Sequence, residues 1–364
     1  LSVSQRSISM SGSRSYNGST TVNSSDLSVF NNLVSGETLD ITGSGTVSSA
    51  NVGLSKSVTI GSLSLSNGTG SSANYTLGSA TLDITQKSLT ISGSKVYDGT
   101  NVIQGSNFST FSGIVSGETL SITGSGTVAS GNIGNDKTVT NTSLQLLDGS
   151  GLGSNYSIAN TISADITLRP VNLSGSRVYD GTTDAAASDL SLGNLVSGEN
   201  ISLSGTGTLG SAAVGSQTIT NIGSLAISDG SSSASNYSLT GALSMAITKR
   251  PVTVTGSKFY DGTTNAAASN LTSFTNLVSG ETLSLSGNGS VASSAVGSNK
   301  SVSHQTLALA NGSGAASNYS LGNVTININK RILSLDGIRA FDGNTTVSSS
   351  DISTFGNIVS GESL

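Results

Sequence analysis

Apolar and polar residues alternate along most of this chain, in short runs separated by glycine-rich breaks every 8 to 20 residues. The clearest alternating pairs are Val252 and Val254, Leu283 and Leu285, Leu307 and Leu309, and Ile326 and Ile328. A period of two is typical of half-buried β-strands, whose successive side chains lie on opposite faces. No stripe with the 3.6-residue period of a helix is long enough to form one. The pattern predicts an all-β protein of short strands and tight turns.

The alternating pattern is itself repeated, because one aromatic element returns at steps of 81, 82, 81 and 81 residues. Its five copies are Tyr16-Asn17-Gly18, Tyr97-Asp98-Gly99, Tyr179-Asp180-Gly181, Tyr260-Asp261-Gly262 and Phe341-Asp342-Gly343. Such self-similarity at a fixed period is typical of tandem modules. A module of this length is predicted to hold six to eight short strands.

Two further landmarks recur with the same period. The sequence Val-Ser-Gly-Glu places every glutamate of the chain at one repeat position: Glu37, Glu118, Glu199, Glu281 and Glu362. The sequence Asn-Tyr ends at Tyr75, Tyr156, Tyr237 and Tyr319. All eight tyrosines therefore belong to repeated landmarks.

Repeat boundaries are predicted where the last strand of one copy meets the first strand of the next. The predicted units are residues 6–86, 87–168, 169–249 and 250–330, preceded by the last strand of another repeat in 1–5 and followed by the first half of a fifth in 331–364. Since Leu1 matches Ile326 and Leu364 falls inside a unit, we expect a window onto a longer array. Connections of two or three residues predict an elongated, stiff rod of modules about 30 Å across.

Composition and charge limit the functions to consider. Charged residues make up 10% of the chain and the net charge is −5, so the positive surface of a nucleic-acid-binding protein is not expected. No apolar run reaches the length of a membrane helix, and no leader peptide is visible, so any export signal is expected outside this segment. The absence of cysteine suits a protein exported to an oxidising space.

Residues 252–264, Val-Thr-Val-Thr-Gly-Ser-Lys-Phe-Tyr-Asp-Gly-Thr-Thr, carry a family resemblance, together with Leu-Val-Ser-Gly-Glu, Ala-Val-Gly at 295–297 and Ser-Asn-Tyr-Ser-Leu at 317–321. Over the whole chain the sequence resembles the YDG-type repeat domain, found in tandem in large bacterial exoproteins similar to filamentous haemagglutinins. The resemblance implies an immunoglobulin-like β-sandwich and a role as a surface adhesin or its stalk, outside the bacterial cell. Asn17 and Phe341 depart from the motif, which argues against obligatory carboxylate or phenol chemistry there.

We interpret the Tyr-Asp-Gly element as structural. Asp-Gly after a strand supplies the positive-φ residues of a tight turn, and the ring before it can plug one end of a small sandwich. Two functional alternatives remain: a repeated aromatic platform for stacking sugars, and a calcium loop. One recurrent aspartate supplies few of the six to eight oxygen ligands that calcium takes.

No catalytic, cofactor-binding or metal-binding residue is predicted, and we do not expect an enzyme. His304 is the only histidine and the chain has no cysteine, so neither a zinc site nor a Ser-His-Asp relay can be assembled. Residues 205–210 match the dinucleotide fingerprint G-x-G-x-x-G, but the other repeats do not keep the third glycine.

Charged and sequon positions complete the pattern. A basic residue recurs two positions before each aromatic residue: Arg14, Lys95, Arg177, Lys258 and Arg339. We hypothesise that it forms a cross-strand ion pair with the recurrent glutamate, the alternative being two independent solvated charges. Sequons at Asn74, Asn155, Asn236 and Asn318 leave glycosylation open, although these asparagines are better explained as turn caps beside a buried ring.

The sequence favours a structural stalk or fibre module of a bacterial adhesin. Its expected partners are the neighbouring repeats of the same chain and other copies in a fibre. The alternative is that the repeats themselves bind host or environmental glycans multivalently. Buried tyrosines would favour the stalk and exposed ones the binding function. A β-solenoid remains an alternative architecture, although no sub-period of 20 to 30 residues is visible.

Overall fold

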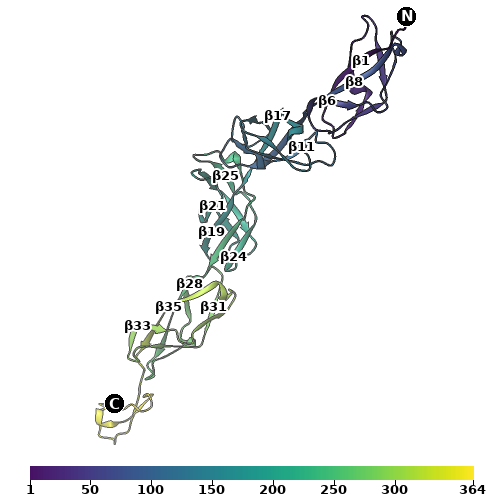
Figure 1. The fold of residues 1–364 in the computed structure, drawn as a ribbon. Helices are drawn as coiled ribbons and strands as arrows, with labels where there is room; N and C mark the ends of the chain where they lie inside the picture. The colour runs from purple at the N-terminus through teal and green to yellow at the C-terminus, as the bar shows by residue number, and fades with distance from the viewer. The chain divides into compact units, whose positions relative to one another are not determined.

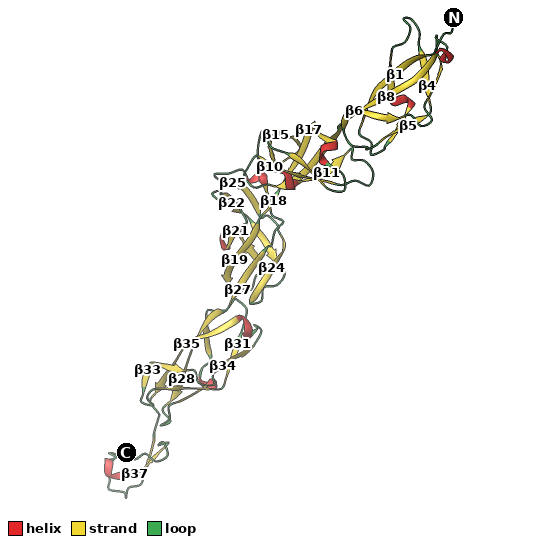
Figure 2. Ribbon diagram, viewed as in Figure 1, coloured by secondary structure: helices red, strands yellow, loops and turns green.

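The computed structural model describes all residues from 1 to 364 and consists of β-strands joined by turns and loops (Figures 1 and 2). Its helical segments are 3-10 turns of three residues each, and none of them has the length or apolar character to cross a membrane. These turns are η1 (Ser24–Asp26), η2 (Ser72–Asn74), η3 (Gly105–Asn107), η4 (Gly153–Asn155), η5 (Ala187–Asp189), η6 (Ala234–Asn236), η7 (Ala268–Asn270), η8 (Ala316–Asn318) and η9 (Ser349–Asp351). The all-β prediction is confirmed.

The first two repeats contain eight and nine strands. Those of repeat 1 are β1 (Arg6–Ser15), β2 (Thr21–Asn23), β3 (Leu27–Asn31), β4 (Leu39–Thr42), β5 (Ser44–Val47), β6 (Gly53–Thr59), β7 (Ser64–Asn67) and β8 (Tyr75–Thr85). Those of repeat 2 are β9 (Lys87–Val96), β10 (Val102–Gln104), β11 (Phe108–Ser112), β12 (Leu120–Thr123), β13 (Ser125–Thr127), β14 (Gly134–Thr138), β15 (Thr140–Asn141), β16 (Gln145–Asp148) and β17 (Tyr156–Thr167).

The third and fourth repeats contain ten and eight strands, and a strand pair follows them. Those of repeat 3 are β18 (Arg169–Pro170), β19 (Asn172–Val178), β20 (Asp184–Ala186), β21 (Leu190–Gly193), β22 (Ile201–Ser204), β23 (Thr206–Leu209), β24 (Gly215–Asn221), β25 (Ala226–Asp229), β26 (Tyr237–Ser238) and β27 (Ser244–Thr248). Those of repeat 4 are β28 (Arg250–Phe259), β29 (Asn265–Ala267), β30 (Ser273–Thr275), β31 (Leu283–Ser286), β32 (Asn288–Val291), β33 (Gly297–Ser303), β34 (Ala308–Asn311) and β35 (Tyr319–Asn329). The final pair is β36 (Ser334–Gly337) and β37 (Ile352–Gly356). Repeats 2 and 3 exceed the predicted six to eight strands because long strands of repeat 1 are interrupted there, as where β14 and β15 together correspond to β6.

One sheet order recurs. In repeat 1 it is β2-β5-β6-β8-β1-β3, in repeat 3 β20-β23-β24-β27-β19-β21, and in repeat 4 β29-β32-β33-β35-β28-β30, and each of these repeats also has a two-stranded antiparallel sheet such as β31-β34. In repeat 2 the same strands form a three-stranded and a four-stranded sheet. Each of these sheets is made of strands from one repeat, which favours separate modules over the β-solenoid alternative.

The first and last strands of each repeat run parallel and side by side, as β28 and β35 do in Figure 1. Their register runs from Arg250 opposite Tyr319 to Phe259 opposite Asn329. Both strands therefore begin at one end of the repeat and finish at the other. Because a strand rises about 3.3 Å per residue, the two ends of this ladder lie roughly 30 Å apart.

The alternating apolar residues of these strands form the core. In repeat 4 a buried cluster gathers residues from the two parallel strands, from β29, β32 and β33, and from two connections between strands: Val254, Ala266, Leu271, Val291, Val302, Leu307, Val324, Ile326 and Ile328. Of the alternating pairs named from the sequence, Leu285 and Leu309 are partly buried, and the other six residues are buried.

The chain divides into two compact units. Unit 1 comprises residues 1–169, 196–198 and 235–238, and unit 2 comprises residues 170–195, 199–234 and 239–364. Unit 1 holds the junction between repeats 1 and 2, and unit 2 holds the junction between repeats 3 and 4.

Candidate functional site at the junctions between repeats

The strand directions place the sequence landmarks at opposite ends of a repeat. Tyr260 follows the end of β28, whereas Tyr319 begins β35 beside Arg250, at the start of the ladder. We call the aromatic-Asp-Gly turn the knob of a repeat. We call the Val-Ser-Gly-Glu turn, the Asn-Tyr pair and the arginine at the start of the first strand its socket. Every complete repeat thus has a knob at one end and a socket at the other.

The knob of repeat 4 is a tight turn held from inside by a lysine. Asp261 accepts hydrogen bonds from the backbone N–H and the hydroxyl of Thr263, at 2.9 and 3.0 Å, and Gly262 has a φ of +75°. The buried Lys258 ammonium donates to Asp261 Oδ1 at 2.8 Å and to the carbonyl oxygens of Thr263 and Asn265 at 2.9 and 2.7 Å. Lys95 holds the knob of repeat 2 in the same way.

The turn shifts the acidity of its aspartate. Burial alone would raise the pKa of Asp261, but the Lys258 ammonium and the donors of Thr263 outweigh it, and the pKa lies below its ordinary value. In repeat 1, where Asn17 replaces the aspartate, Arg14 instead pairs with Asp26 at 3.1 Å. Arg14 also donates to the backbone oxygens of Ser19 and Thr21, so the recurrent cation closes the turn of its own repeat here too.

The hypothesis that the recurrent basic residue pairs with the recurrent glutamate is wrong. Lys258 lies near the end of β28 and pairs with Asp261, whereas Glu281 belongs to the socket at the opposite end of the same repeat. Arg177 and Arg339 likewise pair with Asp180 and Asp342 of their own turns. The cross-strand pair is prevented by the length of the parallel strands that separate the two charges.

The glutamate instead accepts hydrogen bonds from two tyrosines that belong to different repeats. In unit 2, Tyr179 of repeat 3 donates its hydroxyl proton to Glu281 Oε1 at 2.6 Å, and Tyr319 of repeat 4 donates to Oε2 at 2.5 Å. The two rings meet edge to face, with centroids 5.4 Å apart and planes at 80°. The backbone N–H of Val278 donates to the Tyr319 hydroxyl at 3.1 Å, which completes the polar network.

Unit 1 contains the same arrangement between repeats 1 and 2. Tyr16 and Tyr156 both donate to Glu118 at 2.5 Å, and their ring centroids lie 5.3 Å apart at 78°. A third ring pair in this unit joins Tyr97 and Tyr237, with centroids 5.5 Å apart at 79°. The spacing of the landmarks therefore reproduces one contact geometry along the chain.

The turn glycine is fitted to the socket. A Cβ atom at Gly181 would lie 2.9 Å from Cγ1 of Val278, and one at Gly18 would lie 2.9 Å from the equivalent atom of Val115. Real Cβ atoms do not approach so closely, and φ at Gly181 is +82°. Glycine is therefore required both by the conformation of the turn and by the contact with the next repeat.

The asparagine of the Asn-Tyr pair binds the backbone of the preceding repeat. Asn318 Oδ1 accepts the N–H of Val214 at 3.0 Å in unit 2, and Asn155 Oδ1 accepts the N–H of Val52 at 2.9 Å in unit 1. Asn155 is only 1% exposed. These asparagines connect repeats in addition to ending a 3-10 turn before a strand, and their burial is incompatible with glycosylation in this arrangement.

An arginine at the start of the first strand makes the last polar contact. Arg250 donates to the backbone oxygen of Tyr179 at 3.3 Å and to the carbonyl and side-chain oxygens of Asn276 at 2.7 and 2.8 Å. Arg331 binds the backbone oxygen of Tyr260 and Asn357 in the same way. These arginines stand at the predicted repeat boundaries, and no contact was predicted for them. An arginine recurs at every predicted boundary except the one at Lys87, and this recurrence was the sequence signal for a contact between repeats.

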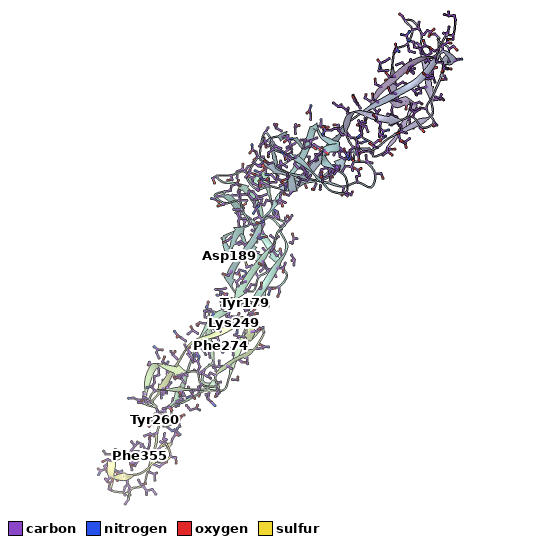
Figure 3. The ribbon with its side chains drawn as sticks, in the orientation of Figure 1. Tyr179, Asp189, Lys249, Tyr260, Phe274 and Phe355 are labelled. Carbon is purple, nitrogen blue, oxygen red and sulfur yellow. The ribbon has the colours of Figure 1, made fainter.

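Apolar packing is continuous across the junction in unit 2. One buried cluster contains Tyr179 and Leu173 of repeat 3 together with Val252, Leu283 and Tyr319 of repeat 4. Phe274, labelled in Figure 3 together with Tyr179, packs against this cluster. The interpretation that the knob ring plugs its own sandwich is therefore incomplete, since the ring is also part of the core of the next repeat.

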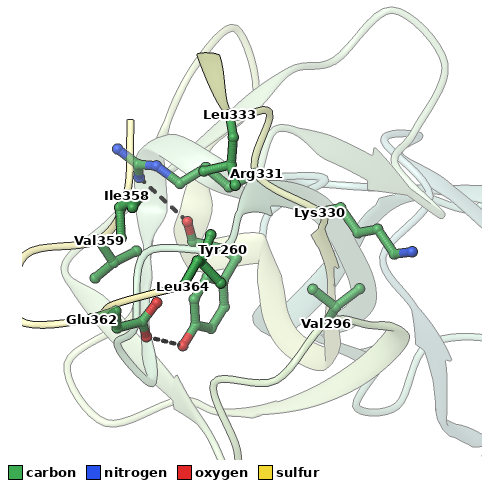
Figure 4. A pocket seen from close by; sticks show the side chains of 9 residues that line it. All are labelled: Tyr260, Val296, Lys330, Arg331, Leu333, Ile358, Val359, Glu362 and Leu364. Atoms are coloured by element: carbon green, nitrogen blue, oxygen red, sulfur yellow. Dashed lines mark hydrogen bonds between the residues drawn. The ribbon is translucent and has the colours of Figure 1, made fainter. Parts of the chain in front are cut away.

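The partial fifth repeat shows what half a junction looks like. Tyr260 donates to Glu362 Oε1 at 2.5 Å, and Arg331 donates to the Tyr260 backbone oxygen (Figure 4). The sequence ends before the position that would hold the second tyrosine, and Tyr260 is only half-buried. Phe341, the next knob ring, is 96% exposed. The knob rings that meet a complete socket, Tyr16, Tyr97 and Tyr179, are 4%, 5% and 5% exposed.

Burial and the shared carboxylate change the acidity of the paired phenols. Burial and the hydrogen bond to Glu281 raise the pKa of Tyr319 to about 12, and burial with Glu118 does the same for Tyr156. The pKa values of Tyr16 and Tyr179 are raised by the same two causes. All four phenols therefore stay protonated donors across the physiological pH range.

No group of three or more histidine, cysteine, aspartate or glutamate side chains gathers where it could hold a metal ion. His304 is exposed just beyond β33, and its backbone oxygen accepts a turn hydrogen bond from Leu307. The chemistry available at the junctions is that of docking one protein surface on another.

Comparison with known families agrees with the repeat landmarks. A family model described as the YDG domain matches four consecutive segments, residues 3–82, 84–167, 162–245 and 247–326. No curated protein matches the chain. The four matched segments together cover most of the sequence, and each carries one socket and one knob.

Proposed function

Because the chain belongs to the YDG domain family, as four tandem repeats, we propose that it is a stalk or fibre segment of a secreted or surface-attached bacterial adhesin. Such a segment would hold a binding region away from the cell surface or form part of an extracellular filament. The proposal includes the extracellular location and the kinship with filamentous haemagglutinin-like exoproteins, both of which rest on the family resemblance.

The proposal is supported by the contacts that the recurrent residues make between repeats. Tyr179, Glu281 and Tyr319 make contacts between repeats, and the two rings are buried there. A module that binds ligands through its recurrent tyrosines would present them to solvent. Here the most regular part of the sequence connects one repeat to the next, as expected of a spacer built from modules joined end to end.

Small-angle X-ray scattering of residues 1–364 tests the proposal. Four modules about 30 Å across, joined end to end, give a maximum dimension of about 120 Å or more, whereas a compact chain of this length would measure about 55 Å. We expect the larger value, and a broader distance distribution for the double variant Glu118→Gln and Glu281→Gln. A compact particle would contradict the stalk. Glycan binding that grows with the number of repeats would favour the multivalent alternative.

A further inference from the structure

The chain enters repeat 4 at one end and leaves it at the other. β27 ends at Thr248 and β28 begins at Arg250, so Lys249 alone connects the last strand of repeat 3 to the first strand of repeat 4. The chain leaves repeat 4 through Lys330, directly after β35. Because β28 and β35 run parallel and side by side, Lys249 adjoins the start of one strand and Lys330 the finish of the other (Figure 1). Tension along the chain therefore acts to slide the two strands past each other.

These two strands are paired over most of their length. Nine residue pairs join them, from Arg250 opposite Tyr319 to Phe259 opposite Asn329. The backbone hydrogen bonds of a ladder run between the strands and not along them, so a pull along the strands strains all of the bonds together. A pull across the strands would instead open them one pair at a time. The ladder thus lies in the direction in which it resists tension best.

Both strands are also held on their outer sides and from below. β30 pairs with β28, and β33 pairs with β35, so each of the two strands has a neighbour on either side. Val254, Val324 and Ile326 are buried in the core of the repeat. A slip of one residue would turn such side chains to the opposite face of the sheet, because side chains alternate along a strand. Sliding therefore requires the loss of apolar burial as well as of hydrogen bonds.

The extent of this ladder differs between repeats. Ten pairs join β1 to β8 in repeat 1, and nine join β9 to β17 in repeat 2. In repeat 3 the first strand is interrupted at Val171, and β18 and β26 form a sheet of their own. The ladder between β19 and β27 has three pairs, ending at Val178 opposite Thr248, and an isolated bridge joins Leu173 to Leu243. Repeat 3 thus has the shortest continuous ladder of the four.

We propose that the parallel ladder between the first and last strands is a mechanical clamp, by which each repeat resists tension along the chain, and that repeat 3 is the weakest of the four clamps. The inference rests on the proposed stalk role only for the source of the tension, since a stalk that holds a binding region away from a surface is pulled at both ends. It fails separately from that role, because an extended stalk need not resist force. Scattering reports the shape of the chain, whereas unfolding under force reports the ladder.

Single-molecule pulling on residues 1–364 in two directions tests the clamp. The chain has no cysteine, so two cysteines introduced on exposed residues are its only thiol attachment points. Lys249→Cys with Lys330→Cys pulls β28 and β35 along their length. Lys249→Cys with Ser317→Cys pulls both strands at their starts and peels them apart. We expect an unfolding force about twofold or more higher in the first direction, because the pairs are strained together and not in succession.

The two directions are matched controls for each other, because both unfold the same repeat. Urea unfolding of each double variant should match that of the wild type, since the substituted side chains are exposed. A difference in force then comes from direction and not from stability. Equal unfolding forces in the sliding and peeling directions would overturn the clamp.

The same measurement compares repeats. Leu168→Cys with Lys249→Cys pulls repeat 3 along its strands, and Leu168 is 43% exposed. We expect repeat 3 to unfold at a lower force than repeat 4, because its ladder is shorter. Each event should lengthen the chain by about 250 Å, the extended length of one repeat less its folded span. A force for repeat 3 equal to or above that for repeat 4 would overturn its assignment as the weakest clamp.

Discussion

Tyr179 and Tyr260 occupy the same position in consecutive repeats, yet the structure buries them differently. Tyr179 is 5% exposed and packs against the ring of Tyr319, whereas Tyr260 is half-buried and bonds to Glu362 and Arg331 of the following repeat without a second tyrosine ring beside it. Their own repeats supply similar surroundings, because both rings follow the first long strand and precede an Asp-Gly turn. The difference shows that the next repeat, and not the repeat that carries it, completes the burial of a knob ring.

The comparison also separates two kinds of tyrosine. Tyr75 of repeat 1 is 4% exposed although no knob contacts it, because Ile8 and Leu39 of its own repeat enclose it. Socket tyrosines therefore belong to the core of their module, and knob tyrosines belong to the junction.

Replacing Tyr319 by alanine should be the most damaging change. The ring is 1% exposed and joins the core of repeat 4 to Tyr179 of repeat 3, so its loss leaves a cavity in both. Large-to-small substitutions of buried aromatic residues cost about 3–5 kcal/mol. Urea unfolding followed by circular dichroism should show an early transition for part of the chain. An unchanged unfolding profile would contradict the assignment of Tyr319 to the core.

Removing one hydroxyl should distinguish the complete junction from the half junction. Tyr179→Phe deletes a donor to the Glu281 carboxylate in a buried network, at a cost of about 1.5–3 kcal/mol. Tyr260→Phe is the matched control, and its effect should be smaller because that hydroxyl is more exposed. The urea midpoints of the two variants provide the measurement. Equal shifts in the two midpoints would mean that the Asn318-Tyr319 pair does not strengthen the hydrogen bond between Tyr179 and Glu281.

Alkaline pH should weaken the complete junctions. The phenol of Tyr319 has a pKa of about 12 against 10.0 in an unfolded chain, so the folded state holds the proton more tightly. Its stabilising contribution is complete below pH 10 and is lost as the pH rises towards about 12. Phenolate absorbance should show a group of tyrosines titrating above pH 10, reduced in Tyr319→Phe. Titration of all eight near pH 10 would refute this prediction.

The smallest effect is expected at Lys258, which holds the knob turn from within repeat 4. Arginine fills this position in repeats 1, 3 and 5, and Arg177 bonds to the carbonyl oxygen of Thr182 and to Asp180 in the equivalent turn. Lys258→Arg should therefore change the free energy of unfolding by no more than about 0.5 kcal/mol. Differential scanning calorimetry of the wild type and the variant measures this difference in stability. A loss well above this value would show that the turn needs a compact ammonium group.

Much of the fold could be predicted from the sequence, because strands and turns are encoded by residues close together in the chain. Alternation at Val252 and Val254 reports a half-buried strand without reference to any distant residue. The Asp-Gly dipeptide after a strand reports a turn for the same reason, and Gly262 has the expected positive φ. The recurrence of these signals was enough to divide the chain into modules.

The partners at the junction could not be predicted, and the reason is the repeat itself. Tyr16 contacts Glu118 of the next repeat, and not Glu37 of its own, yet both glutamates occupy the same repeat position. A periodic sequence cannot distinguish a contact within a repeat from the same contact displaced by one period. Only the parallel pairing of the first and last strands shows that Glu37 lies at the opposite end from Tyr16.

Hydrogen exchange resolved along the chain of Tyr179→Ala tests most directly whether the knob ring belongs to the junction. The account predicts faster exchange in repeat 4, at the socket residues 278–281 and 316–319, as well as near the substitution in repeat 3. Tyr260→Ala, as the control, should leave residues 278–281 unchanged. Faster exchange confined to repeat 3 would contradict the account, because the ring would then serve its own repeat alone.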